Sequence, residues 1–263
     1  MPIWAQSDAA SSWSSSDASL HRSIPLTVLP QGQSHPPEVR QVQVFVNGTL
    51  IPAPSPALYS GPLRVLLLID TSGSMQSSPQ TEKWDPGFAT AAFAVDSIPA
   101  KAPVMVGRFA QDFELSQWQD SSGANKQVFS LKQPFPKGRT ALYSALDKAT
   151  SILGNAQFAD TVFFVTDGGD NFRTGKPQQV VESLAGRGVR VFVFLVDSGV
   201  YKTPEEREAP ENMEELRRQT GGVVFRLPWS KEWISSGAAA VLAKQIQGAA
   251  ASPYEVDFQL ATR

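Results

Sequence analysis

The stretch Val65-Leu-Leu-Leu-Ile-Asp-Thr-Ser-Gly-Ser-Met75 decides the fold of this chain of 263 residues. Its first five residues are apolar, which predicts a strand buried on both faces, as interior strands of parallel sheets are. The polar residues begin abruptly at Asp70, and ligands of open α/β sheets bind just beyond such strand ends. Asp70, Ser72 and Ser74 alternate there with other residues, so a tight loop can turn one carboxylate and two hydroxyls toward one point. Such a cluster of oxygen atoms is typical of a site for a hard cation.

Two distant segments place further oxygen atoms at the ends of predicted elements. Gly138-Arg-Thr140 opens a run whose apolar residues keep to one helical face, so Thr140 lies at the start of a predicted helix. Val162-Phe-Phe-Val165 predicts a second buried strand, and Asp167 follows it as Asp70 follows the first. Each feature alone also fits an ordinary helix cap or a turn, so the case for a site depends on the three segments together.

Taken in order, the three segments spell D-x-S-x-S, then G-x-T at a helix start, then T-D-G after a strand. This combination resembles the von Willebrand factor type A (VWA) domain and its metal-ion-dependent adhesion site, from about Leu63 to Gln247. Phe164-Val-Thr-Asp-Gly168 resembles the bacterial branch of that family. The resemblance carries over five positions as the metal site, namely Asp70, Ser72, Ser74, Thr140 and Asp167.

The resemblance implies Mg²⁺ as the cofactor, with Mn²⁺ or Ca²⁺ as alternatives. In the family the serine and threonine hydroxyls contact the metal, while the aspartates act largely through water or hydrogen bonds. This mostly neutral set of ligands leaves the cation under-neutralised and one position open. A carboxylate from an acidic side chain of a partner protein or peptide would fill that position. We therefore expect a metal-dependent protein-binding module of the adhesion type, and not an enzyme.

Four residues near two of the motifs are candidates for the rim of the ligand site. Lys137 and Arg139 flank Thr140, where their charges would raise the positive potential toward an acidic ligand. Such charges also occur on any solvated surface. Asp170 and Asn171, just past the T-D-G turn, are the other two rim candidates.

Two other functions stay open. The first, within the resembling family, is an assembly subunit that acts beside a partner ATPase, as some bacterial relatives do. The chain does not encode the ATPase itself, since it has no G-x-x-x-x-G-K-[ST] loop. The second is an enzyme, either a metal-dependent phosphohydrolase or a hydrolase with a serine nucleophile. The phosphohydrolase lacks a second aspartate, since position 72 is Ser72. The serine hydrolase lacks a base, because His21 and His35 lie outside the core that carries the serines.

The composition fits one large α/β domain with an appendage, since 41% of the residues are hydrophobic and 18% are charged. A net charge of −2 gives no reason to expect nucleic acid as a partner. The chain has no cysteine, which excludes disulfides and thiolate metal sites. No apolar run approaches the roughly 18 residues that a membrane span needs. Trp4-Ala-Gln6 resembles the end of a clipped export signal, which favours a secreted or periplasmic protein.

Alternating strand and helix patterns predict a Rossmann-like, doubly wound fold, in which helices cover both faces of a mostly parallel sheet. Beyond the two strands at the site, strands are expected at residues 104–109, 189–196 and 223–225. Helices are expected at residues 88–98, 178–187, 204–219 and 233–247. Residues 113–131 are expected to form short antiparallel strands and a loop at the sheet edge.

The termini are expected to form a small β appendage. We divide the chain into a disordered or processed segment (1–20), a β-rich appendage (21–62), the VWA domain (63–248) and a C-terminal strand (249–263). Strands are expected in the appendage at residues 26–29, 40–46 and 49–51. Apolar and polar residues alternate from Tyr254 to Leu260, so this half-buried strand needs a neighbour, which we expect to be an amino-terminal strand. The alternative is a strand cut from a longer protein.

Overall fold

Six strands form a central sheet in the order β10-β9-β8-β5-β6-β7. The computed structural model describes residues 20–29, 38–51, 54–76, 83–132, 136–155, 157–172, 176–197, 199, 201, 203–228, 237–251 and 253–260. The strands are β5 (Val65–Asp70), β6 (Val104–Phe109), β7 (Phe113–Leu115), β8 (Thr161–Thr166), β9 (Arg190–Asp197) and β10 (Val223–Pro228). Neighbours run parallel, apart from β7, which pairs antiparallel with β6 at one edge. Every residue of β5 and β8 is buried, as their continuous apolar sequence predicts.

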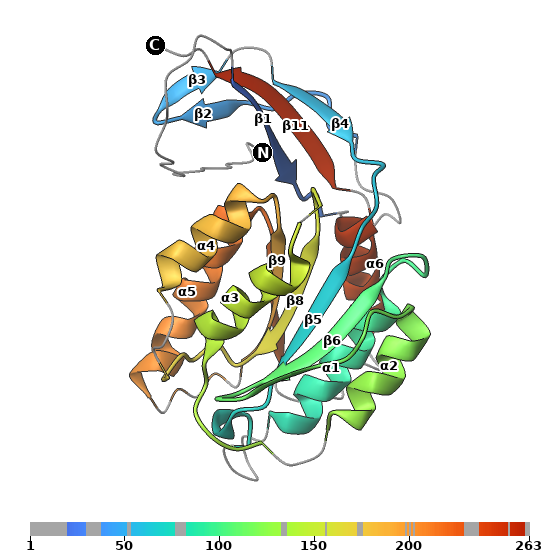
Figure 1. Ribbon diagram of the computed structural model, residues 1–263, viewed down its shortest axis with the longest axis vertical. Coiled ribbons are helices and arrows are strands. Elements are labelled where there is room, and N and C mark those ends of the chain that lie inside the picture. The colour runs from blue at the N-terminus through green and yellow to red at the C-terminus, as the bar shows by residue number, and fades with distance from the viewer. Residues whose placement is uncertain are drawn as a thin grey trace.

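Helices cover both faces of this sheet (Figure 1). The helices are α1 (Trp84–Asp96), α2 (Ser121–Ser130), α3 (Leu142–Leu153), α4 (Pro177–Gly186), α5 (Pro204–Thr220) and α6 (Gly237–Ala251). Buried residues of α1, α2 and α6 share one hydrophobic core with one face of the sheet. Those of α3, α4 and α5 share a second core with the opposite face. The predicted doubly wound α/β fold is therefore confirmed.

A smaller sheet holds both ends of the described chain together. Its strands are β1 (Leu20–Leu26), β11 (Tyr254–Leu260) and β4 (Ser55–Leu58), in the order β1-β11-β4 and all antiparallel. The predicted pairing of the C-terminal strand with an amino-terminal strand is confirmed. A hairpin of β2 (Val44–Val46) and β3 (Thr49–Ile51) packs against β11, with Val44, Ile51, Val256 and Phe258 buried between them. Asn47 and Gly48 form its turn, both with positive φ.

Several predicted boundaries were wrong. The strand expected at residues 26–29 lies earlier, as β1, and only the last three residues of the expected strand 40–46 are paired. The proline-rich connection after β3 contains the unexpected strand β4. Within residues 113–131, β7 is the expected antiparallel edge strand, but residues 121–130 form helix α2. Residues 1–19 of the expected disordered segment and residues 233–236 of the last predicted helix lie outside the described residues, whereas Leu20, also assigned to that segment, begins β1.

Helix α2 forms because Asp120 caps it, as its side chain accepts a hydrogen bond of 2.7 Å from the backbone N–H of Gly123. Ala124 and Val128, four residues apart, then bury one face of the helix. Helix α1 begins four residues before the expected start because Pro86 lies in its first turn, where proline is tolerated. In sequence the segment Asp85-Pro-Gly87 is typical of a turn.

The small sheet and the candidate site lie at opposite ends of the central sheet. Figure 1 shows β1, β4 and β11 beyond the amino ends of β5 and β8, while β5 leads into residues 73–75 at the other end. The polar motifs therefore lie together at the carboxyl ends of the parallel strands, where ligands of such folds bind.

Among the helices of the described residues, none combines the length with the apolar composition that crossing a membrane requires.

Candidate metal site

Asp70 ends β5 and is fully buried. Its Oδ1 accepts a hydrogen bond of 2.9 Å from the backbone N–H of Ser72. Its Oδ2 accepts one of 2.7 Å from the Thr166 hydroxyl, at the end of the adjacent strand β8. The carboxylate therefore fixes the serine loop and joins it to the strand that leads to Asp167.

The serine hydroxyls lie side by side with Asp167. Ser72 Oγ is 3.0 Å from Ser74 Oγ, and the Ser74 hydroxyl donates a hydrogen bond of 3.2 Å to Asp167 Oδ1. Ser72 has no exposed surface, and Asp167 is also buried. Three of the five predicted ligands thus form one continuous cluster of oxygen atoms, and Asp70 is joined to it through the Ser72 backbone.

The loop that carries Thr140 lies directly against the serine loop. The backbone N–H of Gly73 donates to the Gly138 carbonyl at 3.0 Å, and that of Lys137 donates to the Thr71 carbonyl at 3.1 Å. A Cβ atom at position 73 would lie 3.2 Å from the Gly138 carbonyl oxygen, so glycine permits this close approach. Thr140 itself is buried. Segments far apart in the sequence are therefore brought together as predicted.

Two of the four rim candidates hold the Thr140 segment in place. The Asn171 side-chain oxygen accepts a hydrogen bond of 2.8 Å from the Thr140 backbone N–H, and the Thr140 carbonyl accepts from Asn171 and Phe172 N–H groups. Asp170 accepts from the backbone N–H groups of Tyr143, in the first turn of α3, and Phe172. The side chains of Asp170 and Asn171 therefore accept hydrogen bonds from the backbone around Thr140 and the start of α3.

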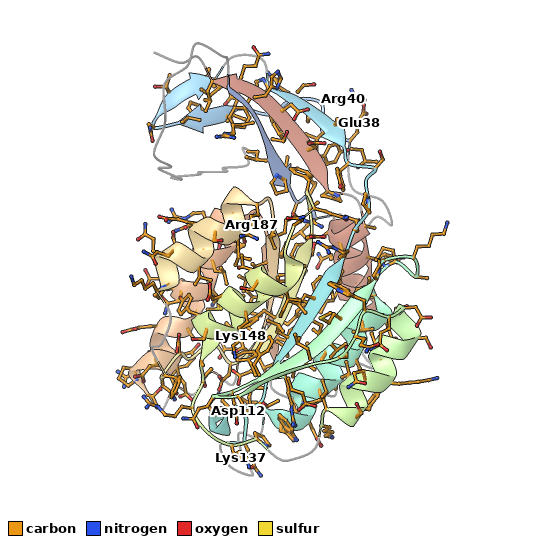
Figure 2. The ribbon with its side chains drawn as sticks, viewed as in Figure 1. Glu38, Arg40, Asp112, Lys137, Lys148 and Arg187 are labelled. Atoms are coloured by element: carbon orange, nitrogen blue, oxygen red, sulfur yellow. The ribbon has the colours of Figure 1, made fainter. Side chains whose placement is uncertain are left out.

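The basic rim candidates are exposed. Arg139 donates to the Asn171 carbonyl and its guanidinium lies 5.2 Å from the centre of the Phe172 ring. Lys137 lies at the same end of the molecule as Asp112 (Figure 2). A role for either residue in contacting a ligand stays a prediction.

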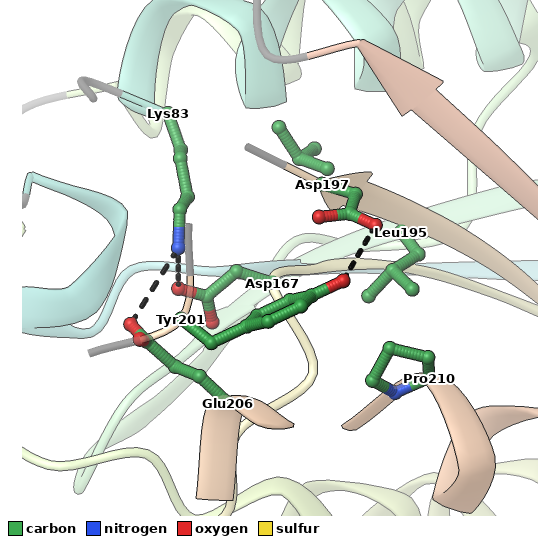
Figure 3. Close-up of a pocket in the computed structure, with 8 residues that line it drawn as sticks. Lys83, Asp167, Leu195, Asp197, Tyr201, Glu206 and Pro210 are labelled. Carbon is green, nitrogen blue, oxygen red and sulfur yellow. Dashed lines mark hydrogen bonds and ion pairs between the residues drawn. The ribbon is translucent and has the colours of Figure 1, made fainter. Parts of the chain in front are cut away.

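The site also includes residues that the motifs did not predict. The Lys83 ammonium donates to Asp167 Oδ2 at 2.7 Å and lies 3.7 Å from Glu206 Oε1 (Figure 3). All three side chains are buried. Thr166, which holds Asp70, lies in the T-D-G motif and was open to recognition from the sequence. Lys83 carried no comparable signal.

Burial and the nearby charges shift the ionisation of this cluster. Burial raises the pKa of Asp70 to about 7, and the charge of Asp167 adds to this, despite hydrogen bonds from Ser72 and Thr166. Burial alone would lower the pKa of Lys83, but the charges of Asp167, Glu206 and Asp70 outweigh it and raise that pKa. Acidic groups are therefore close together here, and a nearby cation would stabilise their ionised form.

The donor set fits a small, hard cation. Within the described ranges, no group of three or more His, Cys, Asp or Glu side chains is placed to hold a metal ion, so hydroxyl oxygens would have to complete the set. Two carboxylates with serine and threonine hydroxyls suit Mg²⁺ or Mn²⁺ and do not suit soft metals. A cavity beside Asp167, lined by Lys83, Tyr201 and Glu206 among others, measures about 10 Å³. That is room for about one water molecule.

Comparisons with known proteins agree with this architecture. Residues 65–169 match the sequence model of the von Willebrand factor type A domain. No curated protein sequence matches the chain. Among solved structures, a von Willebrand factor type A protein from Catenulispora acidiphila matches with a TM-score of 0.55 and 18% identity, over 88% of this chain and 50% of that chain. Proximal thread matrix protein 1 from the mussel byssus matches with a TM-score of 0.52 and 16% identity, over 78% of this chain and 50% of that chain.

A manganese-loaded TRAP protein from Plasmodium vivax also matches, with a TM-score of 0.49 and 16% identity, over 79% of this chain and 82% of that chain. The chain spans about half the length of the Catenulispora and mussel proteins, and at these identities the likeness concerns the fold alone. Residues 65–169 therefore match a von Willebrand factor type A domain, and the chain has the α/β fold that such a domain takes in a solved structure.

Proposed function

We propose that this chain is a metal-dependent protein-binding module, which captures an acidic side chain of a partner through a divalent cation. Ser72, Ser74 and Thr140 would hold the ion, with Asp70 and Asp167 behind them. The observation that carries the proposal is the hydrogen-bonded cluster of oxygen atoms from β5 and β8, beside the buried Thr140 loop. When bound, Mg²⁺ or Mn²⁺ would supply a Lewis acid for a carboxylate ligand.

Binding is favoured over catalysis by what surrounds the serines. A serine nucleophile is commonly activated by a histidine, and among the described residues the polar neighbours of Ser72 and Ser74 are each other and the Asp70 and Asp167 carboxylates. His21, the histidine within the described part of the chain, lies in β1 and contacts Gln259 in the small sheet at the opposite end. We therefore propose no enzymatic role.

The first test is the effect of Mn²⁺ or Mg²⁺ on thermal stability. A cation at about a hundred times its Kd should add about 2.7 kcal/mol, which raises the melting temperature of a domain of this size by roughly 5–10 °C. Asp70→Asn should abolish this shift. Asp112→Asn, which neutralises an exposed aspartate at the same end of the molecule, should keep it. An unchanged melting temperature in wild type, or an equal shift in Asp70→Asn, contradicts the proposal.

The second prediction concerns pH. Since the pKa of Asp70 is raised to about 7 from 3.8, protonation of Asp70 favours the metal-free fold. This contribution to stability is present below pH 3.8 and is lost as pH rises through about 7. A cation prefers the deprotonated form, so Mn²⁺ affinity should increase about tenfold between pH 6 and pH 8. Isothermal titration calorimetry at both values would measure this. A pH-independent affinity would show that Asp70 does not titrate in the site.

A pull-down from native extract, with and without EDTA, would identify the partner. Recovery of an acidic protein ligand in the metal-dependent fraction supports adhesion-type binding, whereas recovery of an ATPase favours the assembly-subunit alternative. Metal-dependent phosphatase turnover that is lost in Asp70→Asn would instead support an enzyme. Cell fractionation would test the predicted secreted or periplasmic location.

A further inference from the structure

Lys83 is a buried lysine that contacts the candidate metal site from outside the three motifs. Its side chain is 5% exposed and pairs with Asp167 and Glu206, whose side chains are 1% and 8% exposed. Its backbone N–H donates to the Met75 carbonyl at 3.0 Å, so the serine loop fixes where this lysine enters the site. A buried ammonium is stable only where carboxylates compensate for the lost water. Lys83 is therefore held both at its backbone N–H and at its side-chain ammonium.

The two oxygen atoms of Asp167 face different groups. Oδ1 accepts a hydrogen bond from the Ser74 hydroxyl, and Oδ2 accepts one from Lys83. Figure 3 shows Lys83 reaching Asp167 and Glu206 from the side where α1 begins. Lys83 therefore compensates the charge of Asp167 without occupying the cluster of hydroxyls, and one carboxylate oxygen remains turned toward that cluster.

Lys83 is shared between two buried acids. Among the described residues, Asp70, Asp167 and Glu206 are buried acids at this site, and the Lys83 ammonium pairs with Asp167 and Glu206. Glu206 is also fixed by α5, because its Oε2 accepts from the Thr203 backbone N–H in a capping box. Without Lys83, two fixed carboxylates would face each other in a buried region.

We infer that Lys83 is an internal counter-cation of the site, which stabilises the metal-free fold and lowers the affinity for a divalent ion. The inference rests on the proposed function. An ammonium and a divalent cation that share the Asp167 carboxylate repel each other, and each stabilises the same ionised carboxylate. The lysine charge is consequently worth more to the metal-free protein than to the metal-bound protein. By linkage, the factor by which the lysine charge favours the metal-free protein over the metal-bound protein is also the factor by which removing that charge tightens metal binding.

The test compares Lys83→Met with wild type in EDTA and in Mn²⁺. Methionine is similar in length and adapts to a buried gap, so the substitution removes mainly the charge. The EDTA-treated variant should melt at a temperature about 5 °C or more below wild type, and its Kd for Mn²⁺ should fall about tenfold. Lys126→Met, which replaces an exposed lysine of α2, should change neither value. An unchanged or weaker Mn²⁺ affinity in Lys83→Met overturns the inference.

A second variant covers the case in which Lys83→Met does not fold without metal. Glu206→Gln retains an acceptor for the capping box and leaves one fewer buried carboxylate, so adding Lys83→Met to it should still tighten Mn²⁺ binding. An equal or weaker affinity in the double variant overturns the inference.

The wild-type measurement by itself tests the proposed function. If wild type binds no Mn²⁺ but Lys83→Met does, the inference stands, and if neither binds, both proposals fail.

Discussion

Replacing Arg190 by alanine is expected to lower the free energy of unfolding by about 3 kcal/mol or more. Arg190 begins β9 and has no exposed surface. Its guanidinium donates to the Ala249 carbonyl at 2.6 Å, the Ala250 carbonyl at 3.2 Å and the Thr161 hydroxyl at 2.9 Å. The two carbonyls belong to the last turn of α6, where carbonyl groups lack partners within the helix. Alanine would leave these acceptors buried and unpaired beside a new cavity.

One effect opposes this loss. Burial lowers the pKa of Arg190 to about 9, so holding the charged guanidinium inside the protein is itself unfavourable. We expect the unpaired acceptors and the cavity to outweigh that relief, because at least three hydrogen bonds of the described residues are lost together.

Urea denaturation would measure the effect of Arg190→Ala. Arg187→Ala is the matched control, because Arg187 is exposed and also donates to carbonyls at a helix end, those of Thr150 and Gly154. It should cost about 1 kcal/mol or less. Equal effects of the two substitutions would mean that burial does not determine the contribution of Arg190.

Gly168→Ala is the second substitution with a large expected effect. Gly168 has a φ of +89°, and a Cβ atom there would lie 2.6 Å from the Ala209 Cβ and 3.0 Å from Leu195 Cδ1. Backbone strain of about 1–2 kcal/mol and overpacking of about 1–3 kcal/mol should together lower stability by about 2–5 kcal/mol. Because Gly168 directly follows Asp167, relief of the clash would move that carboxylate away from Ser74. We therefore expect the Mn²⁺-induced thermal shift to disappear as well.

Gly199→Ala separates strain from the clash. Gly199 also has a positive φ, +68°, but a Cβ there meets no atom of the described residues within 4 Å. This control should show the cost of strain alone, about 1–2 kcal/mol, and retain the thermal shift with Mn²⁺. If Gly168→Ala is no worse than Gly199→Ala, the contact with Ala209 does not constrain the site.

The sequence predicted the parts of the fold where one signal dominates. The continuous apolar runs of β5 and β8 have no other stable place than a sheet interior, and the polar residues after them then share one edge. Helix α2 was missed because Ser121-Ser-Gly123 is typical of a turn, whereas burial of Ala124 and Val128 decides the structure. In this respect tertiary packing outweighed local preference.

The sequence predicted that the motif residues would lie together, whereas their binding of a metal stays a prediction. Asp70, Ser72, Ser74 and Asp167 are joined by hydrogen bonds, which alternation and strand ends suggested. Lys83 was not predictable, because its pairing with Asp167 joins residues 84 positions apart and depends on how α1 meets the sheet. Asn171 was expected at the rim, whereas its side chain holds the Thr140 backbone. Such contacts follow from loop geometry, for which the sequence carries no periodic signal.

The place of β11 between β1 and β4 constrains how the chain can mature on the ribosome. β1 and β4 are synthesised early, yet within the described residues the sheet partner of each is β11, which is synthesised after every strand of the central sheet. The central sheet can therefore assemble while β1 and β4 still present open edges, which are prone to pair with other chains. We expect the small sheet to close last, so a nascent chain halted before Tyr254 would present those edges to other chains while the residues of the candidate metal site were already in place.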